Sequence, residues 1–202
     1  LLVAAVLIAF WPALWGGFIW DDDAHVIANP CVVGPQGLWD IWTSSAARIC
    51  PLVLSTFWLQ YKCWGLNAWP YHLVNLLVHA GSALVLWRVL RALGVRGAWL
   101  GALLWAVHPV QTESVAWITE LKNTQSGLFY LLSVLFYVRM LRAQQQAPGE
   151  GALKGAARST GGGRDYAWAL VFGALGRASK TSVVVLPVVL GLCGWWVEGR
   201  WN

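Results

Sequence analysis

The sequence predicts an all-α polytopic membrane protein, and its composition and apolar segments carry that prediction. The 202 residues are 58% hydrophobic and only 11% charged, whereas a soluble domain typically carries about 25% charged residues. Sixteen residues are tryptophan, and many lie at the ends of apolar segments, a position typical of the membrane–water interface. The lipid bilayer is therefore the first expected partner.

Six apolar segments are candidate spans, since a helix needs about twenty residues to cross a bilayer. The third and fifth are short, so we expect them to extend into flanking residues, to tilt, or to be broken helices buried among neighbours. The first lacks the basic start and the cleavage site of a signal peptide, so we predict a span there. In chain order the segments are Leu1–Trp20, Tyr71–Leu93, Gly97–Val110, Ser126–Met140, Tyr166–Gly176 and Thr181–Val197.

Lysine and arginine predict the orientation, because they concentrate in cytoplasmic loops. They are dense between the second and third spans, between the fourth and fifth, and after the sixth. They are sparse in the long loop 21–70, which we therefore place outside. The net charge of +5 is spread over the loops instead of one soluble face, so we expect no nucleic-acid partner.

We expect one transmembrane domain over residues 1–202, with two long loops. The first outer loop, 21–70, is too apolar for a solvated linker, and Leu52–Trp64 predicts an amphipathic helix along the membrane surface. The loop 141–165 is glycine-rich and polar, which predicts a flexible cytoplasmic segment.

Cysteine spacing points to no metal or redox motif, because no C-x-x-C pair is present. Three of the four cysteines fall in the first outer loop. Two alternatives are open for them, namely one disulfide in an oxidising compartment or free thiols. They are Cys31, Cys50 and Cys63.

Three consecutive aspartates, Asp21, Asp22 and Asp23, directly follow the first apolar segment. The chain has only nine carboxylates, and a carboxylate beside hydrocarbon is costly unless it faces water, protein or a substrate. The plain alternative is a solvated helix end that stops the span. We interpret the run as a candidate site, because other polar residues converge on the same predicted side.

Histidines and amides gather on that outer side. Four polar residues of the second span recur at intervals of three and four, which places them on one helical face and favours a cavity lining. After the third span, Pro109 ends the helix and leaves a histidine and a glutamate near the interface; the alternative is a capped turn with an exposed ion pair. The candidate pocket residues are His25, His72, Asn75, His79, Ser82, His108 and Glu113.

The sequence Ser179-Lys180-Thr181-Ser182 lies between the last two spans. It lacks the glycine that a phosphate-binding loop requires before its lysine. A lysine beside hydroxyls and backbone N–H groups nevertheless suits the phosphate of a lipid; the alternative is a basic residue that only contributes to topology. Carboxylates that deprotonate an alcohol, together with cations that hold a phosphate, favour sugar transfer from a lipid-linked phosphate donor.

Four stretches, in order over nearly the whole chain, resemble the GT-C glycosyltransferases. The likeness is greatest to the tetratricopeptide-repeat transmembrane O-mannosyltransferase-like proteins and their bacterial relatives. The stretches are Phe18–Val26 with Asn29-Pro30, Trp64–Asn67 with Tyr71–His79, His108–Trp117, and Ser179–Pro187.

The resemblance implies an inverting transferase with a polyprenyl- or dolichyl-phosphate sugar as donor, the sugar being mannose-like. It implies an acceptor hydroxyl on a protein Ser or Thr, or on a glycan, at the non-cytoplasmic face. It suggests the bacterial inner membrane as the first choice of location and the endoplasmic reticulum membrane as the second.

The resemblance also implies roles for individual residues. Asp22 is the expected catalytic base, with Asp23 as its partner and Asp21 as a third member. No metal is expected, and no cofactor apart from the donor. The cations expected to bind the donor phosphate are Lys180, Lys122 and Arg48.

Two short stretches depart from the family pattern, and each removes a charge near the expected phosphate. Relatives usually have Arg before the Pro-Leu of the first loop, where Cys50 stands here. Relatives often have Glu-Arg-Lys-Asp after the His-Pro motif, where this chain has Glu120-Leu121-Lys122-Asn123.

The later spans and the C-terminal repeats of the family are absent from these 202 residues, so we expect this segment alone to be inactive. Two alternative functions stay open, namely a transporter or proton-coupled carrier and a non-catalytic membrane scaffold.

Overall fold

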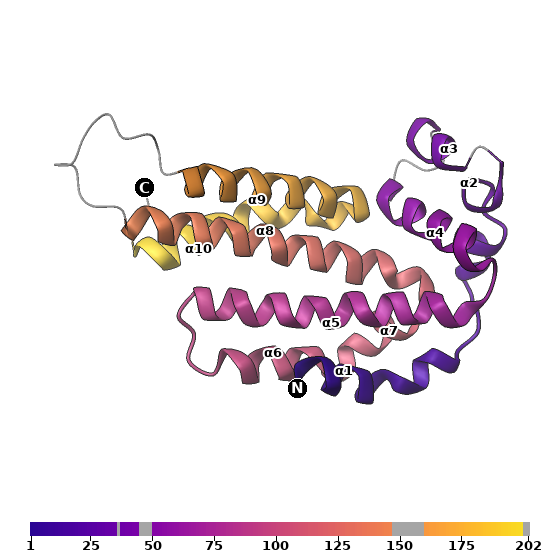
Figure 1. The fold of residues 1–202 in the computed structure, drawn as a ribbon, viewed down its shortest axis with the longest axis horizontal. Coiled ribbons are helices and arrows are strands. Elements are labelled where there is room, and N and C mark those ends of the chain that lie inside the picture. The colour runs from indigo at the N-terminus through magenta and orange to yellow at the C-terminus, as the bar shows by residue number, and fades with distance from the viewer. Residues whose placement is uncertain (36, 45–49, 147–159, 200–202) are drawn as a thin grey trace.

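The computed structural model describes residues 1–202 except 36, 45–49, 147–159 and 200–202. Every regular element among the described residues is a helix, which confirms the all-α prediction. The long helices run alongside one another, and the short helices of the first loop gather at one end of the bundle (Figure 1). Arg48 lies outside the described residues, as do positions 147–159 of the predicted loop 141–165.

Three helical stretches are long and apolar enough to cross a membrane. The first is α5 (Ala68–Ala92). The second joins η4 (Ile118–Glu120) to most of α8 (Leu121–Gln146), and the third joins η5 (Thr181–Val185) to α10 (Leu186–Glu198). Length and composition thus support three of the six predicted spans.

The other three predicted spans are shorter or more polar than expected. The first begins as α1 (Leu2–Phe10) and η1 (Trp11–Trp15), and the chain is extended at Gly16, so the helix stops before Trp20. α6 (Ala98–Ala106) has nine residues and ends shortly before Pro109, as a proline restricts the residue preceding it. α9 (Thr160–Ser179) extends into the polar sequence on both sides of Tyr166–Gly176, which is one of the alternatives expected for this short segment.

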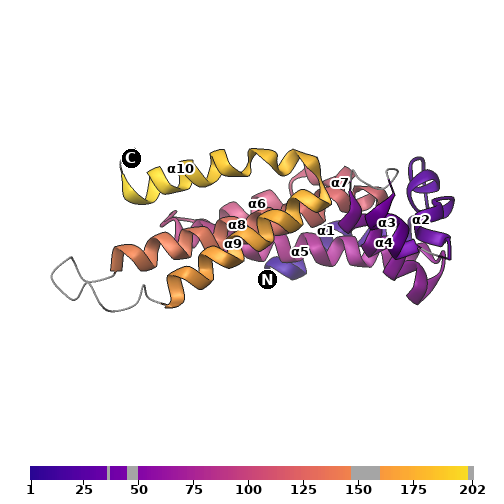
Figure 2. The same ribbon diagram turned by 90° about the horizontal axis from the view of Figure 1, so that it is seen from above.

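The helices pack in two connected groups. α5 contacts α1 and α6 on one side and α8 on the other, and α9 lies along α8. α10 also contacts α8, and Figure 2 shows it to one side of the α8–α9 pair. The apolar interior is divided accordingly, with one core around Val6, Leu76 and Ala106 and another around Val138, Val89 and Leu186.

The first loop is folded and has a core of its own. It contains η2 (Asp23–Ile27), α2 (Pro30–Val33), α3 (Gly37–Thr43) and α4 (Pro51–Trp64). The predicted helix at Leu52–Trp64 is therefore confirmed as α4, which buries Phe57 beside Tyr71 of α5. All four cysteines are free thiols, so the structure favours the second of the two alternatives left open for them.

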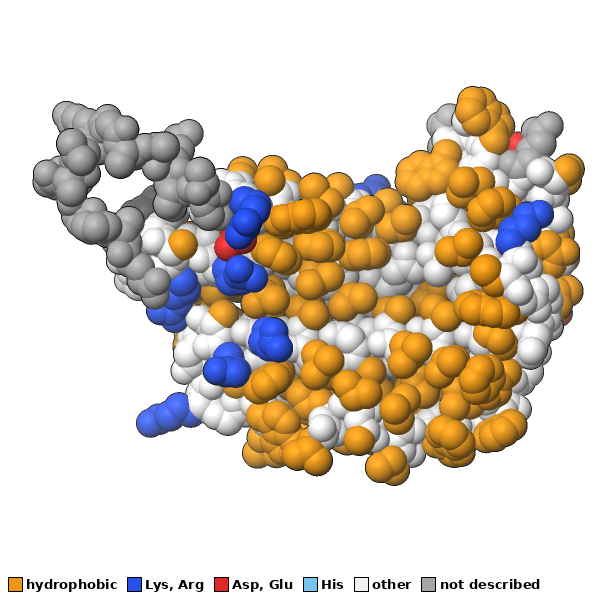
Figure 3. Space-filling model, viewed as in Figure 1, with side chains coloured by type: hydrophobic (Ala, Val, Ile, Leu, Met, Phe, Trp, Pro, Cys, Tyr) orange, Lys and Arg blue, Asp and Glu red, His pale blue; other side chains and the backbone are white. Residues whose placement is uncertain are grey.

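Apolar and basic side chains occupy different parts of the surface. Exposed hydrophobic side chains cover the middle of the bundle, while most of the visible Lys and Arg lie at the end opposite the first loop (Figure 3). At that basic end Arg139 pairs with Asp165 at 3.5 Å. An apolar belt between polar ends is the distribution that a bilayer requires.

Candidate active site

The aspartate run begins at a strained point of the backbone. Trp20 has a φ of +48° and is the one described non-glycine residue with positive φ. Such residues are uncommon and cluster at functional sites. The Trp20 ring meets the edge of the Trp117 ring, with centroids 5.4 Å apart. The single π-helical turn η2 then carries Asp23 and His25.

Asp22 is fully buried and anchors the loop to the bundle. One carboxylate oxygen, Oδ2, accepts a hydrogen bond from the backbone N–H of Ile19 at 2.9 Å. The other, Oδ1, accepts from the backbone N–H of Thr119 at 2.8 Å and from the Thr119 hydroxyl. The acidic loop is thereby tied to η4, a segment 97 residues away in sequence.

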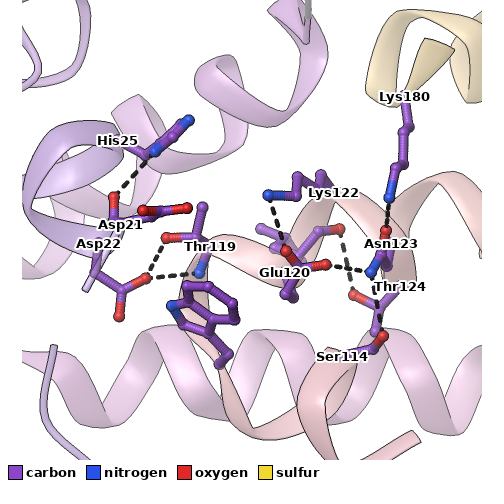
Figure 4. Close-up of polar contacts among 12 residues, drawn as sticks. Asp21, Asp22, His25, Ser114, Thr119, Glu120, Lys122, Asn123, Thr124 and Lys180 are labelled. Carbon is purple, nitrogen blue, oxygen red and sulfur yellow. Dashed lines mark hydrogen bonds and ion pairs between the residues drawn. The ribbon is translucent and has the colours of Figure 1, made fainter. Parts of the chain in front are cut away.

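The other two aspartates are exposed. The Asp21 carboxylate faces the segment that carries Thr119 and Lys122 (Figure 4). His25 donates from Nδ1 to the backbone carbonyl of Asp21 at 3.0 Å, which holds this turn together. One carboxylate of the run is therefore buried and fully bonded, while two are open to an incoming molecule. The catalytic roles expected for the three stay predictions.

Just past Thr119, charged and amide side chains form a network at the start of α8. Lys122 pairs with Glu120 at 2.8 Å. The Asn123 amide nitrogen donates to Glu120 and, at 3.2 Å, to the Ser114 hydroxyl. Lys180 reaches down from the start of η5 and donates to the Asn123 amide oxygen (Figure 4). Two of the predicted phosphate-binding cations thus lie at the same end of the bundle as Asp22.

The four polar residues of the predicted stripe on α5 are all buried. The Asn75 amide nitrogen donates to the carbonyls of Ser114, Val115 and Trp117 at 2.9–3.1 Å, and its oxygen accepts from Thr124. His79 donates from Nε2 to the carbonyl of Ala106 at 2.8 Å. Both residues therefore satisfy buried carbonyls of the chain between α6 and α8.

Two further observations bear on the stripe. His79 and Ser82 line a small cavity of about 50 Å³, together with Asn123 and Thr124. His72 is buried with no hydrogen-bond partner at either ring nitrogen. A Cβ added at Gly16 would lie 3.0 Å from His72 Nε2, so glycine at this position lets η1 approach α5 closely.

His108 and Glu113 are both exposed. His108 Nδ1 accepts from the backbone N–H of Val110 at 3.1 Å and so caps η3 (Pro109–Gln111). This contact matches the capped-turn alternative for the His-Pro motif. Glu113 follows in α7 (Thr112–Ala116). A role for either residue in a substrate pocket stays a prediction.

Cys50, the first departure from the family pattern, lies close to the cations. Burial raises the pKa of its thiol, while the positive charges of Lys122, Lys180 and Arg177 oppose that rise. The thiol is consequently neutral at pH 7 although three cations act on it. Among the described residues, no three His, Cys, Asp or Glu side chains are grouped to hold a metal ion.

A larger cavity of about 610 Å³ lies between α8, α9 and the η5–α10 stretch. Its walls are mainly apolar, with Leu170, Leu186 and Leu190 among them, and Arg177 is the one charged residue among the described residues that line it. Since Arg177 also acts on Cys50, the cavity and the polar network share a neighbouring group.

Sequence reasoning missed three hydroxyl residues, Ser114, Thr119 and Thr124. Each bonds a polar side chain of another segment, namely Asn123, Asp22 and Asn75 respectively. A hydroxyl residue has no spacing pattern that identifies its hydrogen-bond partner in sequence. Asn123 was indicated in the sequence in one way, because it replaces the Asp that the family often has at this position.

Fold and site together define an α-helical membrane protein with carboxylates and lysines gathered at one end of its helices. Comparison with known proteins shows which proteins this chain resembles in sequence. The chain is 33% identical over 147 residues to Protein O-mannosyl-transferase tmtc2 of Xenopus laevis, a match covering 66% of this chain and 18% of that protein. It is 34% identical over 136 residues to Protein O-mannosyl-transferase TMTC2 of Mus musculus, covering 60% and 16%.

A third relative is Protein O-mannosyl-transferase F38B6.6 of Caenorhabditis elegans, 30% identical over 155 residues, covering 69% of this chain and 22% of that protein. The chain is thus a relative of the transmembrane O-mannosyltransferase-like family, as its motifs predict. It spans about a fifth of the length of these proteins. No family model and no solved structure matches it.

Proposed function

We propose that the chain forms part of a membrane glycosyltransferase. The enzyme moves a mannose-like sugar from a polyprenyl- or dolichyl-phosphate donor to the hydroxyl of a protein Ser or Thr, at the non-cytoplasmic face. The observation that carries the proposal is the hydrogen bond between Asp22 and Thr119 of η4, which holds the exposed Asp21 beside η4. Lys122 and Asn123 directly follow η4, and Asn123 contacts Lys180. The printed names of the relatives support the sugar and the acceptor.

In this proposal Asp21 is the proton acceptor and Asp22 positions it. Asp21 is exposed, whereas Asp22 already accepts three hydrogen bonds. The acceptor oxygen attacks C1 of the sugar as Asp21 takes its proton, and the bond from C1 to the phosphate oxygen breaks with inversion. The departing lipid phosphate takes the electron pair and is stabilised by a nearby lysine.

The membrane arrangement is part of the same proposal. Six crossings place loop 21–70, the His108–Asn123 connection and Lys180 outside, and the arginine-rich connections inside. The apolar cavity beside Arg177 offers room for a lipid chain next to the cations.

Sugar transfer by the longer protein that contains this chain tests the proposal. Asp21→Asn should abolish transfer from a polyprenyl-phosphate mannose donor to a Ser/Thr peptide without changing membrane insertion. Asp40→Asn is the matched control, because Asp40 lies in α3 of the same loop, and it should retain activity. Full transfer by Asn variants of all three aspartates would reject the enzyme assignment.

A flux assay in liposomes distinguishes a transporter or proton-coupled carrier from the proposed transferase. Liposomes that hold the wild-type protein should show no proton or solute flux that depends on Asp21. Flux that disappears in Asp21→Asn, with no sugar transfer in the wild type, would favour the carrier over the transferase.

A further inference from the structure

The two lysines of the polar network have different electrostatic surroundings. Lys122 pairs with the Glu120 carboxylate at 2.8 Å, so its charge is balanced within the protein. Lys180 instead contacts the neutral amide oxygen of Asn123. Lys180 belongs to neither of the two ion pairs found among the described residues, Lys122–Glu120 and Arg139–Asp165. The ammonium of Lys180 is therefore held in position while its charge stays unbalanced.

Asn123 is suited to this because its amide offers both a donor and an acceptor. Its nitrogen donates to Glu120 and to Ser114, and its oxygen accepts from Lys180. A carboxylate has acceptors only when ionised. Aspartate at this position would put a second negative group against Glu120 and would neutralise Lys180.

The surroundings add to the positive potential at Lys180. Arg177 and Lys180 both act on the Cys50 thiol, as does Lys122. α4 contains no Asp or Glu and therefore contributes no compensating carboxylate there. Lys180 is partly exposed, and an incoming anion is thus able to reach it.

We propose that Asn123 is a specificity-determining residue, which fixes Lys180 without cancelling its charge, so that Lys180 rather than Lys122 binds the phosphate of a lipid-linked donor. This inference rests on the proposed function for the identity of the ligand. It concerns binding alone, so it is measurable without sugar transfer.

The test is binding of polyprenyl phosphate by the full protein in nanodiscs, with inorganic phosphate as the second ligand. Asn123→Asp should weaken polyprenyl phosphate binding about tenfold or more, because a unit negative charge in contact with Lys180 competes with the ligand. Lys180→Gln should weaken it similarly. Thermal unfolding of each variant checks that it is folded.

Two controls separate contact from net charge. Lys62→Gln changes the net charge by the same one unit as Asn123→Asp, yet it should stay within about threefold of wild type, because Lys62 is exposed on α4 with its ammonium over the rings of Trp58 and Tyr61. Asn123→Ala removes the hold on Lys180 but keeps its charge, so it should weaken binding less than Asn123→Asp does. If Asn123→Asp binds as the wild type does, or Lys62→Gln weakens binding as much, the inference is wrong.

Failure of the inference is distinguishable from failure of the proposed function. A wild-type protein that binds no polyprenyl phosphate contradicts the donor class and with it the ligand named here. Normal binding with no effect of Asn123→Asp contradicts only the inference. Equal affinity for inorganic and polyprenyl phosphate, both sensitive to Asn123→Asp, supports a phosphate site at Lys180 and overturns its assignment to a lipid-linked ligand.

Discussion

Replacement of Asp22 by asparagine should destabilise the protein, and the contacts of the carboxylate set the size of the effect. Asn offers one acceptor oxygen where Asp offers two. Whichever way the amide is turned, its NH₂ group therefore faces the backbone N–H of Ile19 or of Thr119. A buried N–H left without an acceptor costs about 1–3 kcal/mol, and hydrogen bonds to a neutral acceptor are roughly half as strong as those to a charged one.

Together these effects lower the unfolding free energy of Asp22→Asn by about 2–4 kcal/mol. Unfolding of the purified protein in mixed micelles, followed by tryptophan fluorescence, gives the measurement. Asp21→Asn and Asp23→Asn are matched controls, because both aspartates are exposed, and each should stay within about 0.5 kcal/mol of wild type. Equal stability of the Asp22 and Asp21 variants would refute the anchoring role of Asp22.

Substitutions at three further positions test how the site is held. Thr119→Val should cost about 1–2 kcal/mol by removing the hydroxyl donor to Asp22, and Thr119→Ser should restore most of it in the same unfolding assay. Asn75→Ala should lower the free energy of unfolding by about 2–4 kcal/mol, because it leaves several buried carbonyls without a hydrogen-bond donor. Limited proteolysis should then cleave the 106–124 segment faster, and an unchanged cleavage rate would argue that Asn75 does not hold this segment. Gly37→Ala places a Cβ 2.3 Å from Trp58 Nε1, so it should disrupt the packing of α3 against α4. The expected readout is a red shift of tryptophan emission, and an unchanged spectrum and melting temperature would contradict this packing.

Local pattern was enough for α4 and for the three long apolar stretches. The buried positions of Leu52–Trp64 recur at intervals of three and four, as expected of an amphipathic helix; they are Val53, Leu54, Phe57 and Gln60. α5 has its one proline, Pro70, in its first turn, and no proline or glycine pair interrupts the helix beyond it. The predicted spans that end early are those where Gly16 or Pro109 breaks a continuous apolar run, whereas α9 extends beyond its apolar segment.

The site was predictable in its residue types and its end of the bundle, but not in its partners. Spacing alone points to Asn75 and Lys180, yet Asn75 bonds carbonyls about forty residues away and Lys180 bonds an amide 57 residues away. Such contacts depend on how α5, α8 and η5 pack. The same packing buries Asp22, to which the resemblance assigns the base, and leaves Asp21 exposed.

Photocrosslinking tests the central claim most directly, namely that acids and cations at one end of the bundle receive a lipid phosphate. A polyprenyl phosphate with a diazirine next to its phosphate would be bound to the protein in nanodiscs, irradiated, and its attachment sites mapped by mass spectrometry. The account predicts labelled peptides around Asp21, Lys122 and Lys180. Labelling centred on Arg88–Arg96, at the opposite basic end, would contradict it.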